Sequence, residues 1–194
     1  HHRAVADLEH ALEDRFVLVT QNVDGLHLRA GNSLERTYQI HGNIDFMRCA
    51  DECSSAVVPL PEGVDSRWPK GRALGDHERE LLRCARCGAR ARPHVLWFDE
   101  SYDEERFRFQ STLAAAGRAS LLVVVGSTGQ TNLPHQVGEL VARRGASMIV
   151  VNPEPSPFTA FAAQNPRGLF LEGTAGRWLP PLLEQVQAAM SASG

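Results

Sequence analysis

Two closely spaced cysteine pairs are the feature that most restricts the fold of this chain. Cys49 and Cys53 form the first pair, and Cys84 and Cys87 form the second. Zn²⁺ takes four thiolates in a tetrahedron, and short spacings let one turn direct two sulfur atoms at one ion. In a chain of 194 residues such pairs fit metal ligands better than a disulfide framework. We predict a structural zinc ion and a reducing compartment, with incidental thiols or a redox or iron–sulfur role as the alternatives.

Outside the cysteine region, short apolar runs alternate with helical patterns. The expected strands cover residues 16–20, 37–41, 94–98, 121–125 and 148–152, and the expected helices cover 1–14, 104–116, 134–144 and 178 onward. This alternation predicts an α/β fold with a Rossmann-like, doubly wound parallel sheet. Proline and glycine gather in the cysteine region, which favours a small zinc-binding module inserted at residues 47–92. The Rossmann-like domain is then expected in two parts, at residues 1–46 and 93–194.

Charge and hydropathy exclude several classes of protein. The net charge of -3 and the pI near 6.3 create no overall field that would attract nucleic acid or an anionic membrane. Basic residues between the cysteine pairs are balanced by acidic ones, as on a solvated surface. The longest apolar runs are far shorter than the roughly 20 residues that span a bilayer, and the first residues do not resemble a secretory leader. We therefore expect a cytoplasmic protein without a nucleic-acid or membrane partner.

Polar side chains follow the first expected strand directly. Gln21, Asn22 and Asp24 would lie beyond the carboxyl end of this strand, where open α/β sheets bind ligands. Their side chains could bind a carboxamide and ribose hydroxyls, and a capped turn explains them equally well. His41 ends the next expected strand and could act as a general base near neutral pH. It is one of eight histidines, so its position alone does not select it.

The order of these motifs resembles that of the sirtuins, the Sir2-like NAD-dependent protein deacylases. The similarity runs over essentially the whole chain and places the cysteine module where the family has it. The segments that carry it are Thr20–His27, His41–Gly42, the cysteine pairs, Arg92–Glu100, Gly126–Thr128 and Val151–Glu154.

The resemblance implies an NAD-dependent protein-lysine deacylase, with deacetylation as the default reaction. Gln21, Asn22 and Asp24 would line the nicotinamide and ribose part of the NAD site, and His41 would be the general base, with Asn22 and Asp24 beside it in catalysis. In this mechanism the acyl oxygen attacks the ribose carbon as nicotinamide leaves. The histidine then helps a ribose hydroxyl to attack the resulting imidate, and water completes the release of lysine and O-acyl-ADP-ribose.

The resemblance also assigns the remaining binding residues. Val95 and Phe98 would surround the acyl-lysine stem of a protein or peptide substrate, and the backbone after Phe98 would pair with the peptide. A buried strand also explains this segment, because alternate residues face opposite ways. Asp99, Glu100 and Leu133 belong to the implied peptide-contacting loops. The further NAD-binding residues would be Gly126, Ser127, Thr128, Asn152, Glu154 and Ala175.

Some features depart from the family pattern. The Gly-Ala-Gly loop that holds the NAD pyrophosphate should precede the opening helix, and no residues here match it, so we expect an N-terminally shortened sequence. Asp99 replaces the usual glycine and brings a negative charge to the peptide-pairing loop. Two other functions stay open: an NAD hydrolase or ADP-ribosyl transferase, and a catalytically silent protein that binds a peptide or nucleotide.

Overall fold

The computed structural model describes residues 1–67, 69 and 71–191, in two compact units. Unit 1 comprises His1–Leu18, His27–Tyr38 and Phe109–Gly194, and unit 2 comprises Val19–Leu26 and Gln39–Arg108. None of the helices in the described part of the chain is both long and apolar enough to cross a bilayer.

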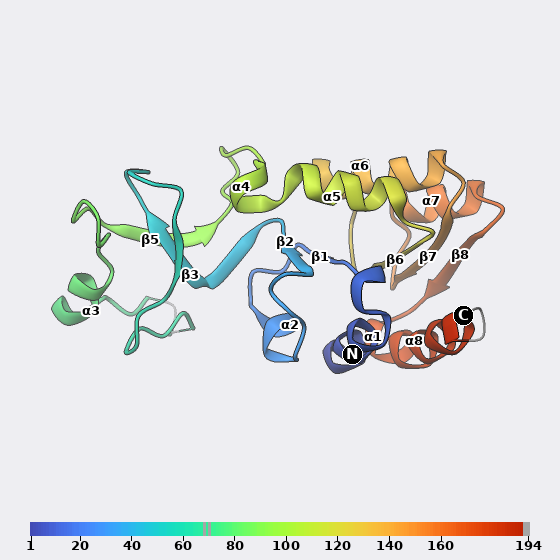
Figure 1. The fold of residues 1–194 in the computed structure, drawn as a ribbon, viewed down its shortest axis with the longest axis horizontal. Coiled ribbons are helices and arrows are strands. Elements are labelled where there is room, and N and C mark those ends of the chain that lie inside the picture. Colours follow the sequence, from blue (N-terminus) through green and yellow to red (C-terminus); the bar gives the residue numbers. More distant parts are fainter. Residues whose placement is uncertain (68, 70, 192–194) are drawn as a thin grey trace. The chain divides into compact units, whose positions relative to one another are not determined.

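A three-stranded parallel sheet forms the centre of unit 1 (Figure 1). Its strands, in spatial order, are β6 (Leu121–Val125), β7 (Ser147–Asn152) and β8 (Gly168–Glu172). Met148 and Val150 of the central strand are 0% exposed. Continuous apolar runs of this kind suit strands that are covered on both faces.

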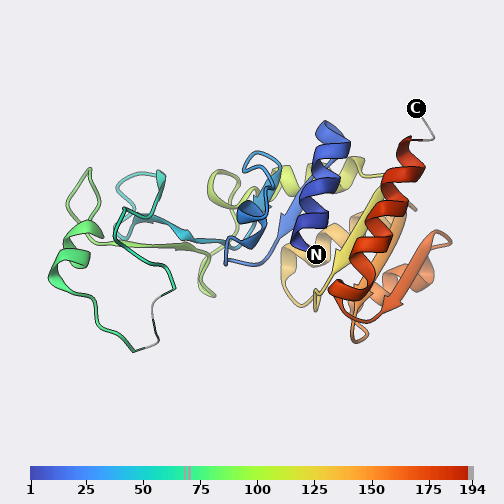
Figure 2. The same ribbon diagram turned by 90° about the horizontal axis from the view of Figure 1, so that it is seen from below.

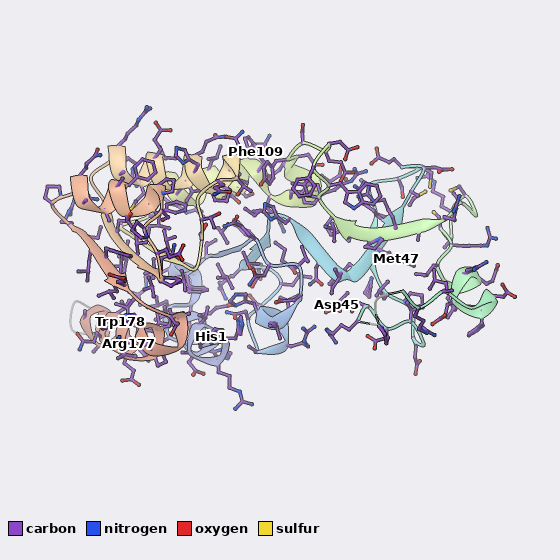
Figure 3. The ribbon with its side chains drawn as sticks, turned by 180° about the vertical axis from the view of Figure 1, so that it is seen from behind. His1, Asp45, Met47, Phe109, Arg177 and Trp178 are labelled. Atoms are coloured by element: carbon purple, nitrogen blue, oxygen red, sulfur yellow. The ribbon has the colours of Figure 1, made fainter. Side chains whose placement is uncertain are left out.

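Helices cover both faces of this sheet. On one face lie α5 (Phe109–Arg118), α6 (Asn132–Arg143) and α7 (Pro157–Gln164), and on the other lie α1 (His2–Leu12) and α8 (Ala175–Ser191). The last two run side by side in both views (Figure 2). Their contact is a cluster of four buried leucines, Leu8, Leu12, Leu179 and Leu183. The indole of Trp178 fixes the start of α8 by donating from Nε1 to the Glu172 carbonyl at 2.9 Å (Figure 3).

The buried carboxylate of Glu9 ties α1 to a loop of the same unit. It accepts hydrogen bonds from Asn32 Nδ2 at 2.7 Å and from the Ser33 N–H at 3.1 Å. Burial acts to raise the pKa of Glu9, but the hydrogen bonds from Ser33 and Asn32 outweigh it, and the pKa lies below its usual value. The ionised carboxylate therefore stabilises the loop that begins after α2 (Leu26–Arg29).

A short two-stranded sheet pairs β1 (Leu18–Thr20) with β2 (Thr37–Gln39). The single 3-10 turn η1 (Glu13–Arg15) precedes β1. β1 does not belong to the parallel sheet of unit 1.

Unit 2 is built on an antiparallel sheet in the order β4–β3–β5. Its strands are β3 (Gly42–Cys49), β4 (Val57–Pro59) and β5 (Ala91–Val95), and its helices are α3 (Asp76–Leu81) and α4 (Glu104–Phe107). The pairing of β3 with β5 shifts register between Asn43 and Met47, and Asp45 lies in this irregular stretch (Figure 3). The Asp45 carboxylate accepts from Ser66 Oγ at 2.7 Å and so holds the following loop.

The α/β class, the parallel sheet and the clustering of the four cysteines agree with the sequence prediction. Several boundaries were wrong, and two of them have a clear physical cause. The strand expected at 94–98 ends at Val95, because the next residues turn around the Glu100 carboxylate. The helix expected at 104–116 is broken at Arg108, whose φ of 55° is left-handed. The sequence pattern did not indicate β3, β4, β8, α3 or α7.

Candidate active site and metal centre

The four cysteines of unit 2 converge on one point. Their sulfur atoms all lie within 4.8 Å of one another, and none of these cysteines forms a disulfide. The Cys49–Cys87 and Cys53–Cys84 sulfur distances are 3.6 and 3.5 Å. A tetrahedral zinc ion with Zn–S bonds of about 2.3 Å requires sulfur separations of about 3.8 Å. The cluster therefore fits a Cys₄ zinc site, as the spacing predicted.

Two tight turns bring these thiols together. Cys49 ends β3, and Cys84 begins a turn in which the Gly88 N–H donates to the Cys84 carbonyl at 2.9 Å. Hydrogen bonds from the backbone N–H groups of Cys87 and Arg86 lower the pKa of Cys84 to about 6. Hydrogen bonds with the neighbouring Cys87 and Cys84 sulfurs raise the pKa of Cys53 to about 12. Four crowded sulfurs cannot all ionise alone, so a cation is needed to hold them as thiolates.

The candidate base His41 lies in the turn between β2 and β3. Its Nδ1 is 3.1 Å from the Gln21 carbonyl oxygen, and its Nε2 is 2.8 Å from the hydroxyl of Tyr102. Because a carbonyl oxygen only accepts, Nδ1 must carry the proton, and Nε2 then accepts from the Tyr102 hydroxyl. Burial lowers the pKa of His41, and the Gln21 carbonyl acts in the opposite direction without cancelling it. The imidazole is thus neutral at neutral pH, with its lone pair on Nε2.

Gly42 makes this turn possible. Its φ of 84° lies in the left-handed region, and a Cβ added there would stand 2.0 Å from the His94 carbonyl oxygen. We expect Gly42→Ala to lower the free energy of unfolding by about 2 to 5 kcal/mol, from backbone strain and the clash with β5. Gly71→Ala is the matched control, because Gly71 has a φ of 87° and no neighbour within 4 Å. Denaturant unfolding should give a loss of only about 1 kcal/mol for the control, and equal losses would contradict the clash.

The segment after β1 lies in the same unit as His41. The Asn22 N–H donates to Thr20 Oγ1 at 3.2 Å, and Asp24 Oδ1 accepts from the Leu26 N–H at 2.9 Å, at the start of α2. Gln21 meets His41 through its carbonyl oxygen rather than its side chain. The structure therefore brings Gln21 and His41 together directly, and it uses Asp24 as a local turn cap.

The candidate NAD residues of unit 1 gather at the carboxyl ends of β6 and β7. Asn152 joins the two strand ends, because its Nδ2 lies 3.1 Å from the Ser127 carbonyl and 3.2 Å from that of Glu154. Its Oδ1 is buried and has no hydrogen-bond partner among the described residues. Gly126 has a φ of 60°, and an added Cβ would meet nothing within 4 Å. An acceptor left without a partner at this edge suits a ligand hydroxyl, provided that the edge opens to expose it.

The other candidate residues are more dispersed. Thr128 is exposed next to Ser127, and Ala175 begins α8 and packs against the leucine cluster. Leu133 is 0% exposed in the first turn of α6, so its side chain offers no surface in this conformation.

Residues 96–102 form what we call the peptide loop. Phe98 is fully exposed there, and Trp97 is 51% exposed, while Val95 ends the preceding strand. Asp99 is exposed, whereas the Glu100 carboxylate accepts from Arg92 and from the Trp97 N–H. Burial acts to raise the pKa of Glu100, but these hydrogen bonds and that of Arg48 lower it to about 2.

The sequence pattern did not indicate two residues that contact the candidate site directly. Tyr102 reaches His41 from 61 residues away, and Arg48 reaches Glu100 from 52 residues away. Nothing in the local pattern singles out Tyr102. Arg48 stands directly before a zinc ligand, and that position was the one available signal.

Comparisons with known proteins agree on one family. The Sir2 family profile matches residues 1–132. A Leptospira interrogans protein named NAD-dependent protein deacylase is 32% identical over 185 residues, which are 95% of this chain and 66% of the relative. NAD-dependent protein deacylase 1 of Pseudomonas aeruginosa is 36% identical over 184 residues, with 95% and 67% covered. The chain thus spans about two thirds of the length of these relatives.

Solved structures lead to the same conclusion. A Sir2 homologue in complex with NAD superposes with a TM-score of 0.75 at 28% identity, covering 97% of this chain and 64% of the other. Sir2Af2 bound to a myristoylated histone peptide gives a TM-score of 0.71 at 27% identity, covering 98% and 72%. With the cysteine cluster, the strand-end edge and the histidine turn already in place, these matches show that the chain belongs to the Sir2 family.

Proposed function

We propose that this protein is an NAD-dependent protein-lysine deacylase that releases nicotinamide and O-acyl-ADP-ribose. The observation that carries the proposal is His41, whose Nδ1–H is fixed by the Gln21 carbonyl so that Nε2 is left as the proton acceptor. The names of the Leptospira and Pseudomonas relatives support the same activity.

Each group of residues would have a separate role in the reaction. NAD supplies a nicotinamide leaving group and an electrophilic ribose carbon. Gln21, Asn22 and Asp24 would bind the nicotinamide carboxamide and its ribose, close to His41. The Nε2 atom of His41 would accept a proton from a ribose hydroxyl, which takes the position of the Tyr102 hydroxyl. The lowered pKa of His41 keeps this nitrogen unprotonated at neutral pH.

The remaining NAD contacts would come from unit 1. The unpartnered Asn152 Oδ1 is suited to accept from an adenosine ribose hydroxyl. Gly126 at the end of the neighbouring strand is exposed, and an added Cβ there would meet nothing within 4 Å. The other proposed contacts at this edge are Ser127, Thr128, Glu154 and Ala175.

An acyl-lysine peptide would bind at the peptide loop. The fully exposed Phe98 and the half-buried Val95 would enclose the apolar lysine stem and its acyl group. Asp99 would face basic residues of the peptide, and Leu133 would contribute only if the first turn of α6 rearranges. The Sir2Af2 complex with a myristoylated peptide supports an acylated peptide as the substrate class.

The zinc ion would be structural. Four thiolates fill a tetrahedral shell and leave no open position for a substrate. Cysteines that hold a metal as thiolates fit a reducing compartment, and we propose a cytoplasmic location on that basis.

Acyl-lysine dependence is the direct test of this function. The full-length protein should release nicotinamide from NAD only when an acetyl-lysine peptide is present, and it should yield the free-lysine peptide in equal amount. Release without the peptide would instead indicate an NAD hydrolase, and no release in either case would indicate a binding protein. Nicotinamide and both peptides can be quantified by liquid chromatography in the same reaction, with an unmodified lysine peptide as the control.

A further inference from the structure

Arg48 lies at the centre of a chain of charged side chains in unit 2. It directly precedes Cys49 on β3, and only 1% of its side chain is exposed. Its Nη1 donates to Glu52 Oε1 at 2.6 Å, and its Nη2 donates to Glu100 Oε1 at 2.5 Å. A buried guanidinium needs such partners because removing its charge from water is costly, and its forked donors can reach two carboxylates at once.

One end of this series of charged side chains, Glu52, belongs to the zinc site. Glu52 lies in the turn between the ligands Cys49 and Cys53, and its φ of 51° is left-handed. The direction of its side chain therefore depends on a turn that the two sulfurs close. Glu52 Oε1 also accepts from Arg106 at 2.9 Å. The metal-held turn thus fixes the position of the Glu52 carboxylate, which accepts a hydrogen bond from Arg48.

The residue at the other end of the series, Glu100, holds the peptide loop. Glu100 accepts from Arg92 Nη1 at 2.7 Å and from the Trp97 N–H at 2.8 Å, in addition to its bond with Arg48. The Arg92 guanidinium lies 3.5 Å from the Trp97 ring centroid and donates to the Val95 carbonyl at 2.9 Å. The segment from Val95 to Glu100 is therefore wrapped around the Glu100 carboxylate, and both oxygens of this carboxylate accept hydrogen bonds.

The same loop is attached to His41 at both of its ends. The Leu96 N–H donates to the His41 carbonyl at 3.0 Å, and this attachment would remain during the reaction. The Tyr102 hydroxyl donates to His41 Nε2 at 2.8 Å until a ribose hydroxyl takes its position. Between these attachments the loop presents Phe98 to solvent. A change in the shape of the loop would alter how Phe98 is presented, while the ring of His41 stays fixed by Gln21.

We propose that Arg48 and Glu100 are positioning residues through which the zinc-held turn at Glu52 sets the shape of the peptide loop, and with it the affinity for the acyl-lysine peptide. This inference rests on the proposed deacylase function. Glu100 then shapes the loop and does not contact the peptide, because its oxygens accept from Arg48, Arg92 and the Trp97 N–H.

Glu52→Gln tests this coupling in the zinc-loaded, full-length protein. We expect the KM for an acetyl-lysine peptide to rise about fivefold to tenfold, because one charged partner of Arg48 is lost. The kcat should change by less than about twofold, since His41 is untouched. Backbone hydrogen exchange in residues 97–102 should become faster. Asp51→Asn is the matched control, because it removes an exposed charge from the same turn, and it should behave as wild type with equal zinc content.

Two further outcomes separate the possibilities. Glu52→Gln combined with Glu100→Gln should raise the KM no more than Glu100→Gln alone, because both act through Arg48; additive losses would overturn the coupling. Equal exchange rates in the Glu52→Gln and Asp51→Asn proteins would overturn it as well. If the wild-type protein shows no turnover, the deacylase proposal fails, and hydrogen exchange in the peptide loop still decides whether Glu52 controls its shape.

Discussion

His41→Gln is expected to slow formation of the deacylated peptide by about 100-fold or more. The glutamine amide is similar in size and can accept from the Tyr102 hydroxyl, but it cannot take up a proton. Single-turnover chromatography with saturating NAD would measure the rate. The midpoint of thermal unfolding and the zinc content should stay close to those of wild type. His77→Gln, at an exposed position on α3, is the control and should keep full activity.

The pH profile provides an independent check on the same residue. Burial lowers the pKa of His41 below its usual value of 6.5, and the reaction needs the neutral form. As pH falls, deacylation should therefore persist through 6.5 and decline only when the pH drops through the lowered pKa. An acid limb of kcat/KM above pH 6.5 would contradict His41 as the base.

Removing zinc should unfold the antiparallel sheet of unit 2. The two hydrophobic clusters of the described residues, one under α5–α7 and the other between α1 and α8, both belong to unit 1. Among the buried apolar side chains of the described residues, only Ile40, Cys49 and Phe107 lie in unit 2. Structural zinc sites contribute about 10–16 kcal/mol of binding energy to small modules. After chelation, hydrogen exchange should lose protection in β3, β4 and β5, while β6, β7 and β8 keep theirs.

Restoring zinc is the control for this experiment, and it should return the protection of all three strands. Cys87→Ser should reproduce the chelated state at neutral pH, because a neutral hydroxyl is a poor fourth ligand. Unchanged protection in the metal-free protein would show that the sheet is stable without the ion.

The sequence alone was sufficient for features that depend on local pattern or on ligand type. The cysteine spacings predicted the metal cluster, because few other roles need four thiols in two turns. The apolar runs at 121–125 and 148–152 predicted buried parallel strands, because only strands covered on both faces are apolar throughout. The motif order predicted the Sir2 family, which the comparisons show. The roles of His41 and of the segment from Gln21 to Asp24 stay predictions of that resemblance.

Only the tertiary structure decided which residues support those groups. Tyr102 contacts His41 across 61 residues of chain, and Arg48 contacts Glu100 across 52 residues. The Glu100 carboxylate also accepts from Arg92. β3 was missed because its irregular pairing with β5 hides the alternation of a strand. Such contacts join residues that are far apart in the sequence and depend on the tertiary fold. The local conformational preferences of single residues do not encode them.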